Sequence, residues 1–311
     1  MKIAFWSEET QVETAFHMSL MACAFAWMRP VSIAAISGGY QGKELEKSLI
    51  RSRRKGNAAQ DFSDGWEREY LPGSRQGGRK KKAVLEPFAG IGRQKAGEGL
   101  FAAEQQEYFV PSGLDCLLGK RREDLTEQAV LANMHPVVED RMYCLPGSKR
   151  PEQEWWHKDP LFTGLKQVLD AMEECFNIVF VDCGNRKDDF AQWVLKEADI
   201  CVLNMDQESE LIGDYYRNPP KLRGKVFFLI GNYFEDGLYT RRNLQRLYRV
   251  DEDLLGAIPY HAQMKEAARA GRIGTEVRNY VRKDRTPSYT VFGQELSRAA
   301  RLLLQLAGTG N

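Results

Sequence analysis

Short runs of hydrophobic residues alternate along this chain with segments that have helical periodicity. The first runs, Lys2–Trp6 and Val31–Ile36, are almost continuously apolar and flank an apolar helical segment at about 15–27. Uninterrupted apolar character is typical of strands buried on both faces of a parallel sheet. Further strands are predicted by the same criterion at Met142–Leu145, Asn177–Asp182, Ile200–Asn204, Val226–Ile230 and Leu254–Pro259.

The segments between these runs show the spacing of amphipathic helices. In Leu161–Phe176, apolar residues recur at positions 161, 165, 168, 169, 172 and 176, which places them on one helical face. Other helices are expected at 43–49, 123–134, 189–197 and 240–248, and within 288–306. The alternation predicts an α/β fold, a doubly wound and mostly parallel sheet with helices on both faces, formed by one domain over 1–311.

One stretch breaks this pattern. Residues 51–82 hold ten Lys/Arg against four acidic residues, and no hydrophobic period is visible through about residue 106. We therefore expect a flexible basic insertion at 51–106. It could be an arm for a partner, for anionic lipid or for nucleic acid, but sparse aromatic residues favour a solvated loop.

Charge and cysteine usage narrow the functional classes. The 44 basic and 43 acidic residues leave a net charge of +1, so nucleic acid is not an expected partner of the whole chain. The six cysteines are scattered, without a C-x-x-C pair, which argues against a metal site or a disulfide framework. Reduced cysteines favour a cytoplasmic location.

The loop between the first strand and the first helix holds the first candidate chemistry. Residues 7–14 read Ser-Glu-Glu-Thr-Gln-Val-Glu-Thr. A phosphate-binding loop at this place needs glycines that let N–H groups close around phosphate, and a lysine. This loop has neither, although Thr14 could cap the helix or contact Mg²⁺ through its hydroxyl. An ordinary strand-to-helix turn explains the segment equally well.

Two later strands end in polar residues. Asp182 ends an apolar run, where a carboxylate at the sheet's carboxyl edge can hold Mg²⁺ or orient water. Asn232 follows the predicted strand Val226–Ile230, and its side-chain amide could read an adenine edge. Pro259 lies in the last predicted strand. Aspartate and Gly-Asn pairs also begin turns without any further role.

The order of these segments resembles the MinD/ParA class of deviant Walker A P-loop ATPases. Within that class it is most similar to the TadZ/CpaE branch, which localises the assembly of type IVb (Flp/Tad) pili. The resemblance covers most of the chain outside about 51–106. It is carried by KIAFWS, SGLDCLLG with LTEQAV, YCLPGS, NIVFVDCGN, ADICVLNMDQE, VFFLIGNYF and GAIPY.

The resemblance also shows what the first loop lacks. Members of this class carry a loop of the form K-G-G-x-G-K-S/T. With the two loops aligned on Thr14, the signature lysine falls on Glu8 and the phosphate-binding lysine on Glu13. The glycines fall on Glu9, Thr10 and Val12. Asp182 matches the Walker B or switch II aspartate and Asn232 the adenine-reading asparagine. The resemblance thus implies a vestigial nucleotide site of Thr14, Asp182, Asn232 and Pro259.

The expectation is therefore a catalytically inactive, ATPase-like scaffold or localisation protein of Flp/Tad-type pilus assembly. It would bind protein partners without a cofactor, at the inner membrane face or the cell pole, with peripheral membrane contact and homodimerisation as further expectations. A first alternative is a weak MinD/ParA-type ATPase in partitioning or cell-division positioning. It would use ATP and Mg²⁺, with a replacement cation from around Arg79–Lys82. A second alternative is a DNA-associated partitioning protein that uses 51–82.

Overall fold

The computed structural model describes residues 1–38, 43–51, 112–148, 159–281 and 290–308. These residues belong to one compact unit formed by Met1–Ser52 and Phe109–Asn311. Apart from Arg51, which is exposed, the predicted insertion at 51–106 lies outside the described residues, as does Arg79–Lys82.

The centre of the unit is an eight-stranded sheet in the order β3-β4-β2-β5-β1-β6-β7-β8. All neighbouring strands are parallel except β3, which runs antiparallel to β4 at one edge. The strands are β1 (Lys2–Trp6), β2 (Ile33–Ser37), β3 (His135–Val138), β4 (Met142–Leu145), β5 (Ile178–Gly184), β6 (Ile200–Met205), β7 (Lys225–Tyr233) and β8 (Leu255–Pro259). The mostly parallel sheet predicted from the sequence is confirmed.

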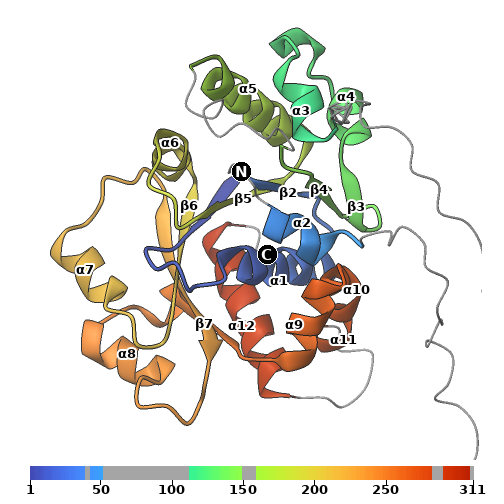
Figure 1. Ribbon diagram of the computed structural model, residues 1–311. Coiled ribbons are helices and arrows are strands. Elements are labelled where there is room, and N and C mark those ends of the chain that lie inside the picture. Colours follow the sequence, from blue (N-terminus) through green and yellow to red (C-terminus); the bar gives the residue numbers. More distant parts are fainter. Residues whose placement is uncertain (39–42, 52–111, 149–158, 282–289, 309–311) are drawn as a thin grey trace, which may run out of the picture. The chain divides into compact units, whose positions relative to one another are not determined.

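Helices cover both faces of this sheet (Figure 1). One face is covered chiefly by α1 (Thr14–Met28) and α12 (Val291–Leu306), and the other by α5 (Asp159–Cys175) and α6 (Asp189–Glu197). The remaining helices are α2 (Lys43–Leu49), α3 (Leu114–Leu118), α4 (Glu127–Ala132), α7 (Leu211–Arg217), α8 (Arg241–Tyr248), α9 (Ala262–Arg269), α10 (Ile273–Glu276) and α11 (Arg278–Val281). The predicted doubly wound architecture is therefore also confirmed.

One helix prediction is wrong in detail. The segment 123–134 forms a 3-10 turn at Arg122–Asp124 and the separate helix α4, not one continuous helix. Leu125 has ψ 57° and leaves the helical region, and the Thr126 hydroxyl then caps α4 by accepting the Ala129 N–H. The cap therefore starts a new helix where the hydrophobic pattern alone suggested continuity.

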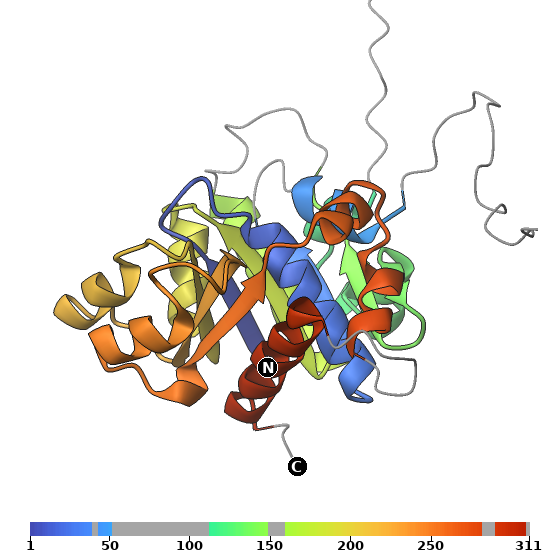
Figure 2. The same ribbon diagram turned by 90° about the horizontal axis from the view of Figure 1, so that it is seen from below.

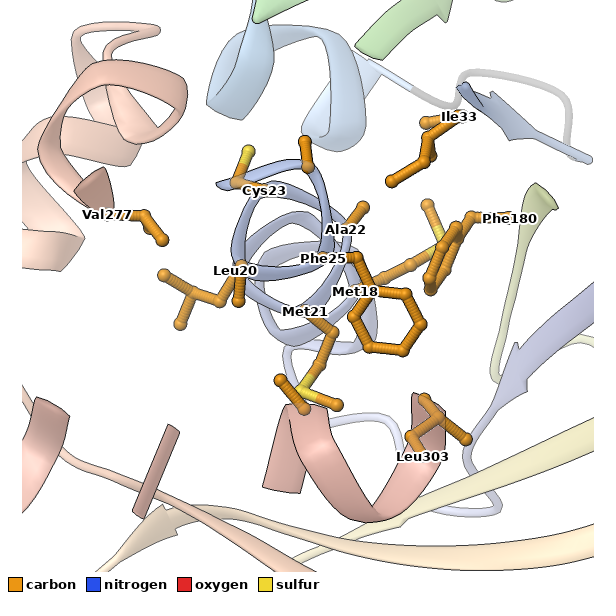
Figure 3. Packing of buried hydrophobic residues seen from close by; sticks show 14 of the residues in the cluster. Met18, Leu20, Met21, Ala22, Cys23, Phe25, Ile33, Phe180, Val277 and Leu303 are labelled. Carbon is orange, nitrogen blue, oxygen red and sulfur yellow. The ribbon is translucent and has the colours of Figure 1, made fainter. Parts of the chain in front are cut away.

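Alternation along the strands sorts their side chains between two cores. Phe180 of β5 lies on the α1 face, 5.6 Å from Phe5 and 5.4 Å from Phe25 between ring centroids. Val179 and Val181 point to the opposite core, under α5 and α6. Figure 3 shows the apolar side chains around α1, and Figure 2 shows α12 beside it. Because α1 follows β1 through the short loop 7–13, its beginning lies at the carboxyl edge of the sheet.

Among the described residues, no helix combines the length and apolar character that crossing a bilayer requires.

Candidate functional site

The loop between β1 and α1 follows the carboxyl edge of the sheet. Its first residue, Ser7, donates its N–H to the Gly184 carbonyl at the end of β5, at 2.8 Å. Its last residue, Glu13, has φ −80° and ψ 66°, and the Thr14 N–H donates to the Val12 carbonyl at 2.9 Å. This is an inverse γ-turn. The loop therefore enters α1 through a tight turn that uses the first N–H of the helix internally.

Thr14 does not cap α1, contrary to one expectation from the sequence. It is the first residue of the helix, and Glu13 occupies the cap position without a capping hydrogen bond from its side chain. The Thr14 hydroxyl is buried and lies 3.4 Å from the Val12 carbonyl oxygen. Both hydrogen-bond donors of Thr14 thus face the Val12 carbonyl within the same loop.

A cavity of about 510 Å³ opens beside the start of α1, and we call it the α1 cavity. Thr14 and Asp182, predicted as site residues, both line it. Four cationic side chains line it as well: Lys47 from α2, Arg186 from the loop after β5, and Lys265 and Arg269 from α9. The site is therefore assembled from four separate parts of the chain.

Glu13 is tied to residues from both sides of the loop. Its carboxylate forms an ion pair with Lys265 and accepts a long hydrogen bond, 3.4 Å, from the Asn232 side-chain amide. The Lys265 ammonium also lies 4.5 Å from the Phe16 ring centroid. Burial, and then the charge of Arg269, lowers the pKa of Lys265 to about 8. The Glu13 carboxylate opposes this effect by stabilising the charged ammonium.

Asp182 is a buried carboxylate on β5, paired in register with Phe5 of β1 and Ser37 of β2. Its side chain accepts the Gly184 N–H at 2.9 Å, and the residue is only 8% exposed. Burial raises the pKa of Asp182 to about 6, although the Gly184 N–H and Arg186 act in the opposite direction. A carboxylate with a raised pKa in a cavity is a frequent mark of a functional site.

Asn232 and Pro259 lie apart from the α1 cavity. Asn232 has the left-handed φ of 49° and lines a second cavity of about 440 Å³, on the β6 and β7 side of the loop. Its side-chain oxygen is buried without a hydrogen-bond partner among the described residues. Pro259 is buried at the end of β8, in register with Tyr233, and lines neither cavity. The structure thus brings Thr14 and Asp182 together and connects Asn232 to them through Glu13.

The four cations of the α1 cavity were not anticipated from the sequence. Lys265 and Arg269 belong to α9, whose eight residues follow β8 without a long hydrophobic period. Arg186 was the most accessible to sequence reasoning, because it comes four residues after Asp182. Its Nη1 donates to Asp188 at 3.0 Å, while Nη2 is buried without a partner among the described residues.

The carboxylates that line the α1 cavity, Glu13, Glu44 and Asp182, come from separate elements. In the part of the chain that the structure describes, no group of three or more His, Cys, Asp and Glu side chains is arranged to hold a metal ion. Glu8, at the position matching the signature lysine, lies 3.7 Å from the Lys187 ammonium. The carboxylates of the loop are thus partly neutralised by lysines of the chain itself.

A strand, a loop and an enclosed helix at the carboxyl edge of a parallel sheet are typical of nucleotide-binding α/β folds. Within that class, the sheet and its surrounding helices match the MinD/ParA folds. No family model matches this chain, and no curated protein matches it in sequence.

Several solved structures superpose on this chain over most of its length. A ParA family ATPase from Chlorobium tepidum TLS superposes with a TM-score of 0.59 at 10% identity, over 96% of both chains. The cell division ATPase MinD of Pyrococcus furiosus gives 0.59 at 12% identity over 98% of both chains. MinD of Pyrococcus horikoshii OT3, complexed with Mg-ADP, gives 0.58 at 13% identity over 100% of this chain and 98% of the other. At identities this low, the structural likeness establishes the fold alone. The TadZ/CpaE branch therefore stays a prediction.

Proposed function

We propose that this protein is a positioning or scaffold protein with the MinD/ParA fold, and that it acts by binding proteins without hydrolysing ATP. The observation that carries the proposal is the ion pair between Glu13 and Lys265. Glu13 stands at the start of α1, where a phosphate-binding loop needs a cation, and its counter-ion comes from the chain itself.

Electrostatics at the loop oppose a bound triphosphate. A carboxylate in place of a lysine about 4 Å from a phosphate turns an attraction of about 1–4 kcal/mol into a repulsion of similar size, so the interaction energy changes by about 2–8 kcal/mol, depending on the local dielectric. The loop contributes three carboxylates, of which Glu8 and Glu13 stand at lysine positions and Glu9 at a glycine position. In the absence of phosphate the same charges near the helix N-terminus are favourable, because they oppose the positive end of the helix dipole.

Backbone geometry acts in the same direction. Phosphate loops use free N–H groups at the beginning of the helix, with glycines that let the backbone approach closely. Here the Thr14 N–H is hydrogen-bonded to Val12, and residues 7–14 contain no glycine. A triphosphate would have to open the turn before these donors could bind it.

The cations of the α1 cavity favour a second candidate, the weak MinD/ParA-type ATPase that uses ATP and Mg²⁺. Three of them already face carboxylates: Lys47 pairs with Glu44, Arg186 with Asp188, and Lys265 with Glu13. Arg269 makes no ion pair with any described residue. If these ion pairs opened, their lysine and arginine side chains would become available to phosphate, and the stabilisation from the existing pairs would be lost.

The partners belong to the same proposal. Resemblance to the TadZ/CpaE branch suggests pilus-assembly components at the inner membrane face or the cell pole, and a homodimer that does not need ATP. Adjacent genes for a pilus secretion ATPase and pilins, together with polar fluorescence of a tagged protein, would support this pathway. A gene neighbourhood without them and uniform fluorescence would contradict it.

Nucleotide binding can be measured directly by titration calorimetry with ATP and Mg²⁺. We expect no saturable heat, which corresponds to a dissociation constant above about 1 mM. Glu13→Gln removes the charge at the start of α1, and Glu139→Gln, at an exposed turn between β3 and β4, is the matched control. Micromolar binding by the unmodified protein, lost in Asp182→Ala, would refute the proposal and establish the second candidate.

A further inference from the structure

Four large side chains form an exposed apolar surface beside the candidate site. They come from the loop after β7 and from the residue after β8: Phe234 (59% exposed), Leu238 (87%), Tyr239 (43%) and Tyr260 (50%). The rings of Phe234 and Tyr260 stack, with centroids 6.0 Å apart and planes 16° apart. We call these four residues the aromatic edge.

The backbone that carries the aromatic edge is held in place by side-chain amides. Gln207 accepts the Phe234 N–H at 3.0 Å and donates to the carbonyls of Phe234 and Tyr239 at 2.8 and 2.9 Å. Asn243 donates to the Leu238 carbonyl at 2.8 Å. The apolar side chains are therefore presented from an anchored loop, which lowers the entropy that a binding partner would have to offset.

The cavity of about 440 Å³ adjoins the aromatic edge, because Phe234 belongs to that edge and also lines the cavity. Its lining includes the carboxylates of Glu9, Asp206 and Glu208 and contains no lysine or arginine, and we call it the acidic cavity. None of the three carboxylates forms an ion pair with a described residue. Burial, and then the charges of Glu9 and Glu208, raises the pKa of Asp206. A cation placed in this cavity would relieve that repulsion.

We propose that the aromatic edge and the acidic cavity together bind a basic, apolar segment of a partner protein. Lysine or arginine side chains would enter the acidic cavity and pair with its carboxylates, while apolar residues of the segment cover Leu238 and the stacked rings. The inference rests on the proposed function, because it assigns a partner chemistry to a protein that acts by binding proteins.

The negative charge of the acidic cavity favours a basic protein segment over nucleic acid, an anionic membrane or a second copy of this chain. Nucleic acid and anionic membrane surfaces are repelled by unpaired carboxylates. In a symmetric dimer this face would meet its own copy, which would bring like charges together. Glu9 and Gln11 of the loop between β1 and α1 line the acidic cavity, so the loop contributes to the surface that recognises a cation.

The probe is a fluorescein-labelled peptide in which arginine and lysine alternate with leucine, and the measurement is fluorescence anisotropy of the full-length protein. Two peptides of equal length serve as comparisons: one with glutamate in place of the basic residues, and one with serine in place of leucine. We expect the basic, apolar peptide alone to bind well, and its affinity to fall as salt increases. Equal binding of the acidic peptide, or no binding of any peptide, would overturn the proposal.

Variants locate the binding to this surface. Asp206→Asn combined with Glu208→Gln, and separately Phe234→Ala, are each expected to weaken binding about tenfold, which corresponds to about 1.4 kcal/mol. Glu139→Gln and Leu247→Ala, which alter exposed residues outside both cavities, are the matched controls and should leave affinity unchanged. Equal loss in the controls would assign the binding to nonspecific attraction.

The experiment separates this inference from the proposed function. Peptide binding is measured with and without ATP and Mg²⁺. A protein that binds both ATP and the peptide refutes the proposed function and leaves the surface assigned, whereas one that binds neither refutes the surface alone. Displacement of the probe by a lower concentration of a synthetic peptide of residues 51–82 would assign the surface to this chain's own basic segment and overturn an external partner.

Discussion

At the scale of single residues, two buried titratable side chains near the site have opposite effects on stability as pH changes. Burial raises the pKa of Asp182 from 3.8 to about 6 and lowers the pKa of His17 from 6.5 to about 4. His17 is fully buried, with its Nδ1 2.9 Å from the Asn204 side-chain amide. Burial therefore shifts both residues toward their neutral forms relative to the unfolded chain.

The signs follow from the number of protons bound in each state. Between about pH 4 and 6 the folded protein holds a proton on Asp182 that the unfolded chain has released, so Asp182 makes stability fall as pH rises. Over about pH 4 to 6.5 the unfolded chain protonates His17 and the folded protein does not, so His17 makes stability rise with pH. The two contributions largely cancel in this window.

Asp182→Asn should reveal this cancellation. Removing the ionised carboxylate is expected to stabilise the protein by about 3 kcal/mol at neutral pH, since one pKa unit corresponds to about 1.4 kcal/mol. The gain should disappear as pH falls from about 6 to 4, where Asp182 of the parent becomes protonated. Urea unfolding across this pH range measures the difference, and Asp140→Asn at an exposed turn is the control. A gain independent of pH would contradict the assignment.

At the scale of elements, α1 is a helix buried on nearly every side. Its buried residues include Phe16 to Ala26 without interruption, so it has no polar face. A helix that is apolar all round is enclosed by the protein, and here α2, α11 and α12 pack around it with the sheet. Close contact is possible at Gly231 of β7, where a Cβ atom would lie only 2.1 Å from the His17 ring.

Gly231→Ala should therefore be destabilising, by about 1–3 kcal/mol, because the added methyl forces a buried ring to move. In a His17→Ala background the methyl has room, so the cost of Gly231→Ala should largely disappear. Thermal and urea unfolding of the four proteins complete the double-mutant cycle. Gly119→Ala, where a Cβ would meet nothing within 4 Å, is the control. Additive costs would show that the two residues do not share this contact.

At the scale of the whole molecule, the described part of the chain is organised around one sheet with a core on each face. Phe180 connects the central strands to α1 through its contacts with Phe5 and Phe25. It is completely buried in the larger core. Because Met1–Ser52 and Phe109–Asn311 form one compact unit, loss of this contact should weaken the whole unit.

Phe180→Ala is expected to reduce the free energy of unfolding by about 3–5 kcal/mol, as large core truncations do. Phe234→Ala deletes the same side chain at an exposed position of the aromatic edge and should change stability by less than about 1 kcal/mol. Urea unfolding followed by circular dichroism compares them. Similar losses in both variants would contradict the placement of Phe180 at the centre of the core.

The sequence alone was sufficient for most of the sheet, because buried parallel strands appear as continuous apolar runs. β1 and β4 were predicted with the observed bounds, and five further strands were predicted with small shifts at their ends. β3 was missed because it is a short edge strand whose first residues, His135 and Pro136, are exposed. The short helices α7 and α9 were missed because two turns give the hydrophobic period little room to show; α2 and α8, of similar length, were predicted.

For the site, the sequence determined which residues lie at the carboxyl edge, because chain order and strand ends placed Thr14 and Asp182 there. The partner of Glu13 was decided only by the tertiary structure. Lys265 belongs to α9, far along the chain, and Asn232 lies 219 positions from Glu13. Pairing between such distant residues depends on how helices and strands pack, and hydrophobic periodicity does not predict that packing. The sequence shows that the loop carries carboxylates, and only the fold shows which charges neutralise them and which remain open to a partner.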